Sequence, residues 1–323
     1  MARETHWHHA WRWLCHQRKR APEQADIWHL RYHWPQTGDA LRRQVEGGHY
    51  RLRPMRVYRR GGRAWVQWDA QDALVLKWVS LNIAGVLPAH RHCLHIRGRA
   101  VRQSVSEVAE SLSGDGFRFV YRTDIRGYYR HIRKEQVMHI VQHYVADPVL
   151  QDLIRQYVYY SVEDGGEFYT PEHGICRGCA LSPLIGAAIL YHADNHFTAR
   201  PGIYYARYMD DFLFFTRTRH QLRWCIKALY AFFEEGGFER HPDKTQAGRI
   251  ERGFDWLGVW FGSEGPAIAP RAIANHRERR LQLYEQARRR GLSEAETTLR
   301  VQAYETRWMT WAEGMLKAAS TQA

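Results

Sequence analysis

The chain of 323 residues contains no long apolar run and few cysteines. No stretch approaches the roughly 18 apolar residues that a membrane-spanning helix needs, and the N-terminus has no apolar signal region. The cysteine count, 5, is odd, which argues against a disulfide framework. Acidic residues are also scarce, with 34 Asp and Glu against 47 Lys and Arg. These shortages argue against a membrane protein or a disulfide-rich secreted domain, and they predict a cytoplasmic protein with reduced thiols.

Cys176 and Cys179 have the spacing of half a zinc site. A structural zinc site needs four ligands, and no second pair follows at a usable spacing. The nearest alternative ligands, His92, Cys93 and His95, form no recognised pattern. We therefore expect no zinc site in this chain.

The basic surplus gives a formal net charge of +13. Such a charge fits a polyanionic partner, with nucleic acid ahead of membrane. The chain also has 13 Trp and 18 Tyr; most should serve the core, although rings interleaved with arginine also suit base stacking. The length suffices for one large or two small domains with a sizeable core.

Two aspartates stand side by side between apolar or aromatic runs at 204–215. The pattern predicts a β-hairpin with Asp210 and Asp211 at its tip. Adjacent carboxylates repel each other and lose solvation beside aromatic rings, and a divalent cation such as Mg²⁺ relieves both effects. A lone Asp-Asp pair would be explained equally well as a solvated turn.

A third aspartate makes the metal hypothesis stronger. Asp124 ends a second strand-like run that begins at Phe117. Two strands that present Asp124 and Asp210 at neighbouring ends can hold two metal ions roughly 3.5–4 Å apart, an arrangement that clamps both oxygens of an in-line phosphoryl displacement. The carboxylates therefore predict a phosphoryl-transfer site with two Mg²⁺ ions, Mn²⁺ being the alternative.

The Tyr-Met-Asp-Asp sequence at 208–211, preceded by Asp124 and its aromatic neighbours, resembles the catalytic centre of a reverse transcriptase. The resemblance extends over about residues 48–261, and its motifs occur in the family's order. The Leu-Ser-Pro-Leu sequence at 181–184 is most similar to bacterial enzymes of the group II intron kind and their domesticated relatives. The motifs are a metal-binding segment at 124–129, a nucleotide-positioning loop at 174–184, the catalytic box at 208–211, a lysine motif at 241–245 and a primer grip at 254–258.

The resemblance implies an α+β fold of the right-hand polymerase type, in which an antiparallel palm sheet packs on helices. The expected parts are a basic Trp/His-rich extension at 1–45, fingers at 46–116, a palm at 117–261 with a fingers segment at about 130–175, and a helical thumb at 262–323. Local patterns predict a hairpin around Gly61-Gly62 and helices at 72–83, 184–197 and 220–236. We also expect a linker at 262–270 and two helices at 271–316, the first of them very basic.

The resemblance also implies the roles of the catalytic residues. Asp124, Asp210, Asp211 and the main chain of Ile125 would hold the metal ions. Lys244 would act as the general acid for the pyrophosphate leaving group. Tyr129 would exclude a 2′-hydroxyl by its bulk. For Tyr128 the alternative is a role as a core aromatic residue. The implied nucleotide-binding residues are Arg60, Arg63, Gly127, Tyr128, Tyr129, Arg177, Gly178 and Lys244.

Template and primer contacts are implied at both ends of the palm and in the thumb. Ser182 also fits a helix cap, with Pro183 in the first turn. The chain departs from the family at Arg177, where a glutamine is usual; arginine cannot accept a hydrogen bond. The implied template- and primer-binding residues are Ser182, Pro183, Tyr208, Met209, Trp256, Leu257, Gly258, Arg279 and Arg280.

The expected function is RNA-directed DNA synthesis on an RNA template, with a DNA or RNA primer and dNTPs as partners. Two alternatives remain open: untemplated, terminal-transferase-like synthesis, which the Arg177 departure allows, and a catalytically silent, maturase-like RNA-binding protein. A complete acidic triad argues against the second. The short segment after 262 leaves no room for intron-encoded domains, so a compact cellular or mobile-element enzyme is expected. Phage defence is one possible role of such an enzyme, and a dedicated non-coding RNA is one possible partner.

Overall fold

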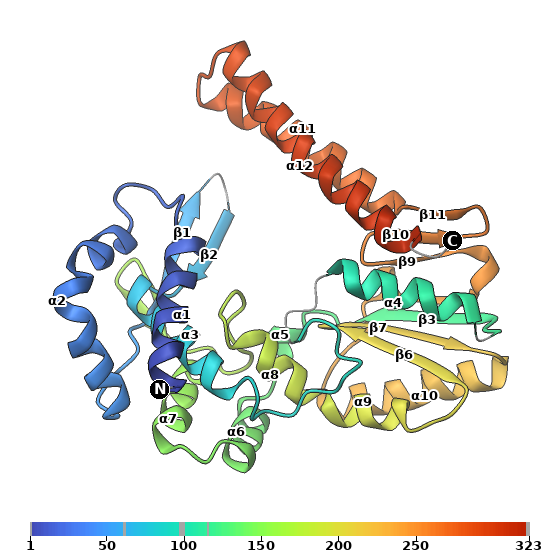
Figure 1. Cartoon of the computed structure of the whole chain (residues 1–323), viewed down its shortest axis with the longest axis horizontal. Coiled ribbons are helices and arrows are strands. Elements are labelled where there is room, and N and C mark those ends of the chain that lie inside the picture. Colours follow the sequence, from blue (N-terminus) through green and yellow to red (C-terminus); the bar gives the residue numbers. More distant parts are fainter. Residues whose placement is uncertain (1, 61–62, 97–100, 115, 321–323) are drawn as a thin grey trace. The chain divides into compact units, whose positions relative to one another are not determined.

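The computed structural model describes residues 2–60, 63–96, 101–114 and 116–320 (Figure 1). The chain forms two compact units. Unit 1 comprises residues 1–90, 126–193 and 233–239, and unit 2 comprises residues 91–125, 194–232 and 240–323. None of the helices within the described ranges combines the length and the apolar character that crossing a membrane requires.

Unit 1 combines helices with a four-stranded sheet of order β2-β1-β4-β5. Strands β1 and β2 form an antiparallel hairpin that pairs Tyr58 with Trp65, and β1 runs parallel to β4. The elements are α1 (Ala2–Gln17), α2 (Asp26–Glu46), β1 (Met55–Arg60), β2 (Arg63–Gln67), α3 (Ala70–Ile83), α5 (Tyr128–His131), α6 (Lys134–Tyr144), α7 (Pro148–Val158), β4 (Val162–Asp164), β5 (Glu167–Tyr169) and α8 (Ser182–Ile189).

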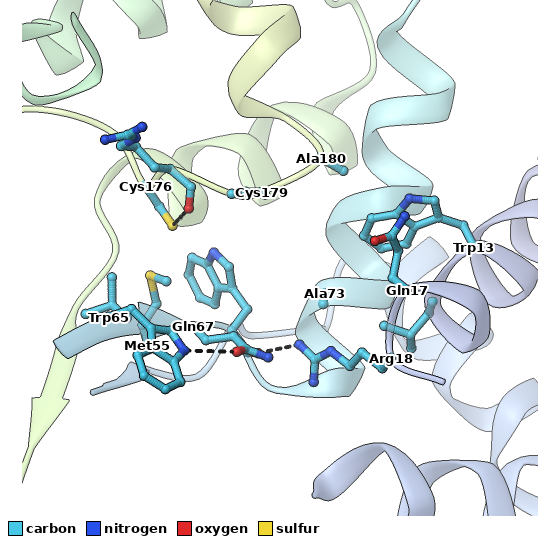
Figure 2. A pocket seen from close by; sticks show the side chains of 15 residues that line it. Trp13, Gln17, Arg18, Met55, Trp65, Gln67, Ala73, Cys176, Cys179 and Ala180 are labelled. Carbon is cyan, nitrogen blue, oxygen red and sulfur yellow. Dashed lines mark hydrogen bonds between the residues drawn. The ribbon is translucent and has the colours of Figure 1, made fainter. Parts of the chain in front are cut away.

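Helix α3 is the centre of unit 1. Nine of its residues are buried, as expected for a helix that is apolar on every side. Helix α1 packs against it, and the rings of Trp7 and Trp78 stack with centroids 5.0 Å apart. A cavity of about 510 Å³ lies among α1, the β1–β2 hairpin, α3 and the loop 176–180 (Figure 2).

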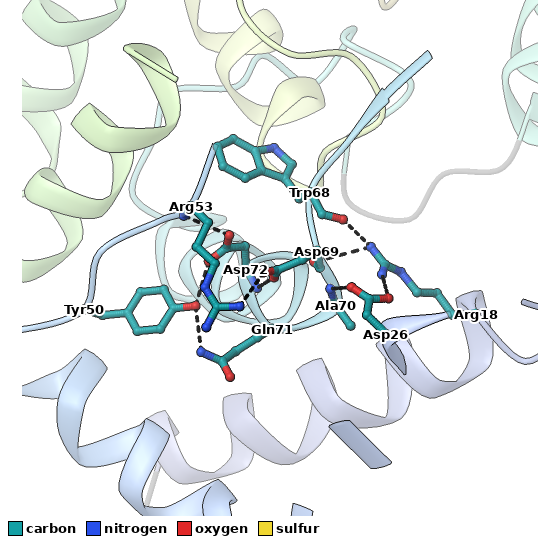
Figure 3. Close-up of polar contacts among 9 residues, drawn as sticks. All are labelled: Arg18, Asp26, Tyr50, Arg53, Trp68, Asp69, Ala70, Gln71 and Asp72. Atoms are coloured by element: carbon teal, nitrogen blue, oxygen red, sulfur yellow. Dashed lines mark hydrogen bonds and ion pairs between the residues drawn. The ribbon is translucent and has the colours of Figure 1, made fainter. Parts of the chain in front are cut away.

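A buried polar cluster fixes the start of α3 (Figure 3). Asp69 caps the helix by accepting a hydrogen bond from the Asp72 amide at 2.7 Å. The fully buried Asp72 carboxylate accepts hydrogen bonds from the Tyr50 hydroxyl at 2.6 Å and the Arg53 amide at 3.0 Å. Burial, helped by the charge of Asp69, raises the pKa of Asp72 to about 7. One carboxylate thus anchors both α3 and the segment that leads into β1.

Unit 2 is built on an antiparallel four-stranded sheet of order β6-β7-β3-β8. Helix α4 covers one face and α9 and α10 lie on the other (Figure 1). The sheet strands are β3 (Phe119–Asp124), β6 (Ile203–Tyr208), β7 (Asp211–Thr216) and β8 (Gln246–Arg249). The helices are α4 (Val101–Gly114), α9 (Tyr191–Thr198, which begins in unit 1), α10 (Arg219–Gly236), α11 (Pro270–Arg289) and α12 (Glu294–Ser320), with short turns η1 (Pro242–Lys244) and η2 (Ile250–Arg252).

A second sheet of unit 2 joins this framework to its C-terminal helices. It has the order β11-β10-β9, from β9 (Phe254–Trp256), β10 (Val259–Gly262) and β11 (Gly265–Ile268). Helix α12 packs on α4 and on β11. Buried residues from β3, β6, β7, β9, β10, α4 and α12 form one apolar core, in which Trp256 and Phe215 are fully buried.

Most sequence-based predictions of individual elements are confirmed. The structure contains the strand ending at Asp124, the hairpins at 55–67 and 204–215, the helices near 72–83 and 220–236, and the pair of helices separated near 291–293. The predicted turn residues Gly61 and Gly62 lie outside the described residues.

Three predictions are wrong. The segment 262–270 is not a linker, because β11 pairs with β10 there. The helix predicted at 184–197 is interrupted at Leu190, which ends α8. Ser182 is not a helix cap; Leu181 takes the cap position, and the Ser182 hydroxyl instead donates to the Cys176 carbonyl oxygen at 2.6 Å.

Asp72→Asn should change how stability depends on pH. Because the folded-state pKa of Asp72 lies above that of the unfolded chain, Asp72 contributes stability at low pH that is lost as the pH rises from about 4 through about 7. An asparagine cannot ionise. We expect the unfolding free energy of the variant, relative to wild type, to rise by on the order of 3 kcal/mol between about pH 4 and pH 8.

Urea denaturation at both pH values measures this difference. Asp152→Asn, which alters a carboxylate whose side chain is 43% exposed, is the matched control and should shift little. Equal pH dependence in wild type and Asp72→Asn would contradict the assignment.

Candidate active site

The predicted catalytic box forms the two-residue turn between β6 and β7. Tyr208 pairs with Asp211 at the end of the hairpin, so Met209 and Asp210 form its tip. The prediction that Asp211 also lies at the tip is wrong, because Asp211 is the first paired residue of β7. Met209 has a φ of 56°, a conformation that side-chain-bearing residues rarely adopt. Its amide donates to His95 Nδ1 at 2.9 Å, and its carbonyl oxygen accepts from Arg207 Nη1 at 2.8 Å. Bonds on both sides of Met209 therefore hold the turn in its strained shape.

Arg207 is held in turn by a buried ion pair. Its guanidinium donates through Nε to Asp194 Oδ1 at 2.7 Å and through Nη2 to Oδ2 at 2.5 Å, and both side chains are fully buried. The Tyr205 hydroxyl also donates to Asp194, at 2.5 Å. Burial opposes the charge, yet Asp194 raises the pKa of Arg207 well above its usual value, so the guanidinium stays charged. The bidentate ion pair between Arg207 and Asp194 thus connects the catalytic turn to α9.

The third aspartate reaches the same end of the sheet. In the β3–β7 register Asp124 stands opposite Asp211. Beyond β3, the Ile125 amide donates to the Asp210 carbonyl oxygen at 3.2 Å, and the His241 amide donates to the Asp124 carbonyl oxygen at 2.7 Å. The predicted metal-binding residues are therefore brought together within unit 2.

The carboxylates of this cluster carry mutually unfavourable charge. Burial, followed by the charges of Asp124 and Asp211, raises the pKa of Asp210 to about 6. Burial also raises the pKa of Asp211, although Arg122 opposes the shift. A cation placed among them would relieve this repulsion.

Protein cations already contact two of the three carboxylates. The Lys244 ammonium donates to Asp124 Oδ2, and Arg122 Nη2 lies 3.2 Å from Asp211 Oδ1. Within the described ranges, no three His, Cys, Asp or Glu side chains are close enough to enclose a metal ion. The oxygen donors nevertheless suit Mg²⁺, which proteins commonly bind through one or two carboxylates, with water and substrate phosphates supplying the rest.

Arg122 also connects this cluster to the predicted primer grip. Its Nη1 lies 3.1 Å from Asp255 Oδ2, and Asp255 Oδ1 accepts from the Gly258 amide at 3.2 Å. The turn between β9 and β10 contains two positive φ angles, 49° at Leu257 and 91° at Gly258. Asp255 thus braces an unusual turn with one oxygen and binds Arg122 with the other.

Other predicted primer contacts differ in exposure. Trp256 is fully buried and its indole donates to Ser104 Oγ at 3.2 Å, so its side chain supports the turn from the core. Arg279 is half-buried beside Gln282. Arg280 Nε lies 2.6 Å from Glu305 Oε1 without hydrogen-bond geometry.

Three of the predicted nucleotide-binding residues, Gly127, Tyr128 and Tyr129, lie at the start of α5 in unit 1. Gly127, with a φ of 62°, precedes the helix. Tyr128 is buried and donates to the Gly186 carbonyl oxygen at 2.7 Å, which favours the core role, whereas Tyr129 is half-buried. The Ile175 amide donates to the Tyr129 carbonyl oxygen at 2.9 Å.

The loop 174–178 is pressed closely onto α5. A Cβ on Gly174 would lie 2.8 Å from the Tyr129 carbonyl oxygen, so only glycine fits there. Arg177 and Gly178 are exposed at the outer part of the loop, and Pro183 is half-buried at the start of α8. The side chains of Arg60 and Arg63 lie outside the described residues.

Four residues that position the site were missed by sequence analysis: Arg122, His95, Asp194 and Arg207. Arg122 had a signal, because a residue two before Asp124 on a strand shares its face. His95 is 114 positions from Met209 and Asp194 is 13 positions from Arg207, and no local pattern connects either of them to the catalytic box.

Comparisons with known proteins bear on this arrangement. The family model described as "Reverse transcriptase (RNA-dependent DNA polymerase)" matches residues 89–261. The structure of telomerase from Candida albicans, in complex with a TWJ fragment of telomeric RNA, is similar with a TM-score of 0.51 and 13% identity, covering 70% of this chain and 46% of that chain. At this identity the likeness shows the fold alone.

A second similar structure is apo telomerase from Candida tropicalis, truncated from its C-terminal domain. Its TM-score is 0.44 at 13% identity, and the match covers 59% of this chain and 43% of that one. The chain therefore spans less than half the length of either telomerase. No curated protein matches the chain.

Asp194→Asn should strongly destabilise the protein. The change leaves the Arg207 charge buried and uncompensated, and breaking a buried ion pair typically costs about 3–5 kcal/mol. Urea denaturation measures the loss. Glu251→Gln, which removes a surface pair with Arg249, is the control and should have no measurable effect. Wild-type stability in Asp194→Asn would mean that the pair does not hold the turn.

Proposed function

Because this chain belongs to the reverse transcriptase family, whose model covers more than half of it, we propose that it adds dNTPs to a primer 3′ end by two-metal phosphoryl transfer. It is an RNA-directed DNA polymerase by family. The observation that carries the proposal is that Asp124, Asp210 and Asp211 meet at one end of one sheet, where burial and the charges of Asp124 and Asp211 raise the pKa of Asp210.

Each predicted catalytic residue has a place in this reaction. Asp124 and Asp210 would be the main metal ligands, with Asp211 adding charge and the main chain of Ile125 nearby. When bound, Mg²⁺ ions would stabilise the attacking primer oxygen and the leaving pyrophosphate oxygen. Lys244, whose ammonium donates to Asp124 in this structure, would be the general acid for the pyrophosphate leaving group.

Nucleotide selection would fall to unit 1. The half-buried Tyr129, backed by the buried Tyr128, would exclude a 2′-hydroxyl and favour dNTPs. The exposed Arg177 guanidinium would contact a phosphate or sugar in place of the family's usual glutamine. Arg60 and Arg63 of the β1–β2 hairpin would bind the triphosphate.

The remaining elements support assignment of the polymerase parts. We assign fingers mainly to unit 1, the palm to the sheets of unit 2 and the thumb to α11 and α12. Arginines along α11, including Arg279, would bind the phosphates of a template–primer duplex without sequence choice. Leu257 and Gly258 would hold the primer end, and Tyr208 and Met209 would lie beside it.

The Leu-Ser-Pro-Leu sequence at 181–184 favours a bacterial enzyme similar to those of the group II intron kind and their domesticated relatives. We infer a compact enzyme with a cellular or mobile-element role, for which phage defence is one candidate. One alternative activity has a specific observation behind it: the exposed Arg177 leaves untemplated synthesis open.

Loss of the Asp210 carboxylate should abolish synthesis. We expect Asp210→Asn to reduce labelled dNTP incorporation on a primed RNA template with Mg²⁺ by at least about a thousandfold, because a metal ligand stabilises transition-state charge by several kcal/mol. Asp243→Asn, at an exposed aspartate beside Lys244, should retain activity. Incorporation that persists in Asp210→Asn would refute the two-metal assignment, and product formed without template would indicate terminal transfer.

Arg122 should couple the primer grip to the carboxylate cluster. We expect Arg122→Met and Asp255→Asn each to raise the primer KM by about tenfold, and the double variant to be little worse than either single one. Residues in one ion-pair network show interaction energies of about 0.5–3 kcal/mol. Steady-state kinetics at varied primer concentration, for wild type, both single variants and the double variant, measures this interaction energy. Additive effects would mean that Arg122 and Asp255 act independently.

A further inference from the structure

The outer face of helices α9 and α10 has no part in the proposed chemistry. Both helices lie on one face of the four-stranded sheet of unit 2 (Figure 1). Residues 192–227 include three acidic residues, of which Asp194 is fully buried while Asp210 and Asp211 belong to the catalytic cluster. The same segment carries several exposed cations. We call four of them the outer cations: Arg200, Arg219, Arg223 and Lys227.

The outer cations are not neutralised by the protein. None of them forms an ion pair with a carboxylate in the described part of the chain, and Asp194 is already paired with Arg207. Three of the outer cations recur at every fourth residue of α10, so they share one side of the helix, with about 6 Å between successive members. Like charges at this spacing slightly destabilise a helix. Folding therefore gains nothing from the row, whereas a polyanion bound along it would be stabilised.

A cavity beside this row holds one of the outer cations in place. The Arg200 guanidinium lies 4.0 Å from the centroid of the Trp224 ring, and the His196 ring stacks on the same indole at 5.2 Å, with planes 14° apart. A planar guanidinium stacked on an aromatic ring has already lost much of its freedom, so less is lost when its N–H groups bind a phosphate. The residues that line the cavity are His196, Ala199, Arg200, Pro201, Gln221 and Trp224.

Gln221 adds a donor of known orientation to this cavity. Its Oε1 accepts from the main-chain amides of Arg217 and Thr218, each at 3.2 Å, and Thr218 Oγ1 accepts from the Gln221 amide at 3.2 Å. This reciprocal capping box closes the start of α10. Because the side-chain oxygen is engaged with the backbone, Nε2 is the atom that Gln221 offers to a ligand. The positive end of the α10 dipole lies at the same place and favours an anion.

The composition of this face distinguishes between kinds of polyanion. In the described ranges, none of the exposed large hydrophobic side chains lies on α9 or α10. Protein interfaces depend on aromatic and other apolar anchors at their centre, whereas phosphate contacts need only arginine, lysine and polar donors. The face therefore fits a nucleic-acid backbone better than it fits an acidic protein.

The face is also separate from the catalytic site. Strand β7 runs from Asp211 to Thr216 and is followed by α10, so Arg219 lies at the far end of the sheet from the catalytic aspartates. Five residue steps along a strand span roughly 17 Å, which corresponds to about five base pairs of a duplex. A strand bound on this face is therefore outside the site of chemistry.

We propose that the outer face of α9 and α10 binds the phosphate backbone of a nucleic-acid segment that lies outside the catalytic site. One phosphate occupies the cavity, where the Arg200 guanidinium and Gln221 Nε2 donate to it. The backbone then follows the row of cations along α10. The phosphodiester chemistry is common to a folded RNA and to a DNA duplex, so both are tested as sources. The inference rests on the proposed function only in that such an enzyme works on both polymers.

Binding is measured without Mg²⁺ or dNTPs, so its outcome is separate from that of the polymerase assay. The probe is a fluorescein-labelled RNA hairpin with a stem of about 12 base pairs, roughly 40 Å long, followed by anisotropy at several KCl concentrations. Arg223→Gln should lower the slope of log affinity against log salt by about one, and the triple variant with Arg219→Gln and Lys227→Gln by about three. Arg155→Gln, which removes an exposed charge from α7, is the matched control and should leave the slope unchanged. A DNA hairpin of the same sequence is measured in parallel, and the polymer with the larger change in slope is the ligand of this face.

A second measurement locates the nucleic acid on the wild-type protein. Lys227 is the outer cation that an acetylating reagent modifies, and a saturating hairpin should protect it several-fold, as measured by mass spectrometry. Lys317, exposed in the last turn of α12, is the internal reference and should stay reactive. On a short primed template the triple variant should incorporate dNTPs at the wild-type rate, because the outer cations lie outside the catalytic site.

Three results would each overturn the proposal: an unchanged salt slope in the triple variant, an equal loss of slope in Arg155→Gln, or full reactivity of Lys227 with either hairpin bound. Protection of Lys227 by polyglutamate but by neither hairpin would also overturn it, and would indicate an acidic protein as the partner.

Discussion

Repulsion among three carboxylates at one end of a sheet is the constraint around which unit 2 is arranged. The β3–β7 register places Asp124 opposite Asp211, and the turn adds Asp210. The fold does not relieve this repulsion by spreading the charges apart. It places cationic side chains against two of them, Lys244 on Asp124 and Arg122 on Asp211. Burial and the neighbouring carboxylates still raise the pKa of Asp210, and burial still raises that of Asp211, so an added cation would stabilise the charged form of both.

A site of this kind needs a rigid turn, and rigidity here comes from buried polar contacts. The strained Met209 has its amide bound by His95 and its carbonyl oxygen by Arg207. Arg207 is itself fixed by Asp194, within an otherwise aromatic surrounding of Tyr205 and Phe197. A buried ion pair is weak evidence of stability, because desolvation offsets the attraction. The ion pair matters here because it fixes the orientation of the Arg207 guanidinium. A guanidinium held by two hydrogen bonds to one carboxylate has a single geometry, so its remaining nitrogen points at the Met209 carbonyl oxygen.

The sequence was sufficient to predict the elements that carry the chemistry, and it was insufficient for their supports. The aromatic-rich runs at 117–124 and 204–215 predicted three strands with three aspartates at their ends, which the structure brings together. Those strands have strong local patterns because they are buried on both faces. The β11 strand was missed because its Gly-Pro start is typical of a loop, and it forms only through pairing with β10.

The positioning residues were missed for a different reason. His95 contacts Met209 across 114 positions of sequence, and Asp255 contacts Arg122 from a separate sheet. Secondary-structure propensities and hydrophobic periodicity do not predict such contacts, because the contacts arise from tertiary packing. Ser182 illustrates the same limit: its hydroxyl suits a helix cap, yet Tyr157 and the Cys176 carbonyl oxygen are closer partners in the folded chain.

The loop 174–181 shows how buried contacts in unit 1 can fix the backbone beneath an exposed side chain. Its inner end is pressed on α5 at Gly174, next to Tyr129, and its middle is fixed by Ser182 and Tyr157 through the Cys176 carbonyl oxygen. Held from both sides, the loop leaves Arg177 exposed, and the neighbouring Cys176 lines the cavity of about 510 Å³. Because the loop has few ways to yield, the backbone that carries Arg177 is fixed while its guanidinium stays open to solvent.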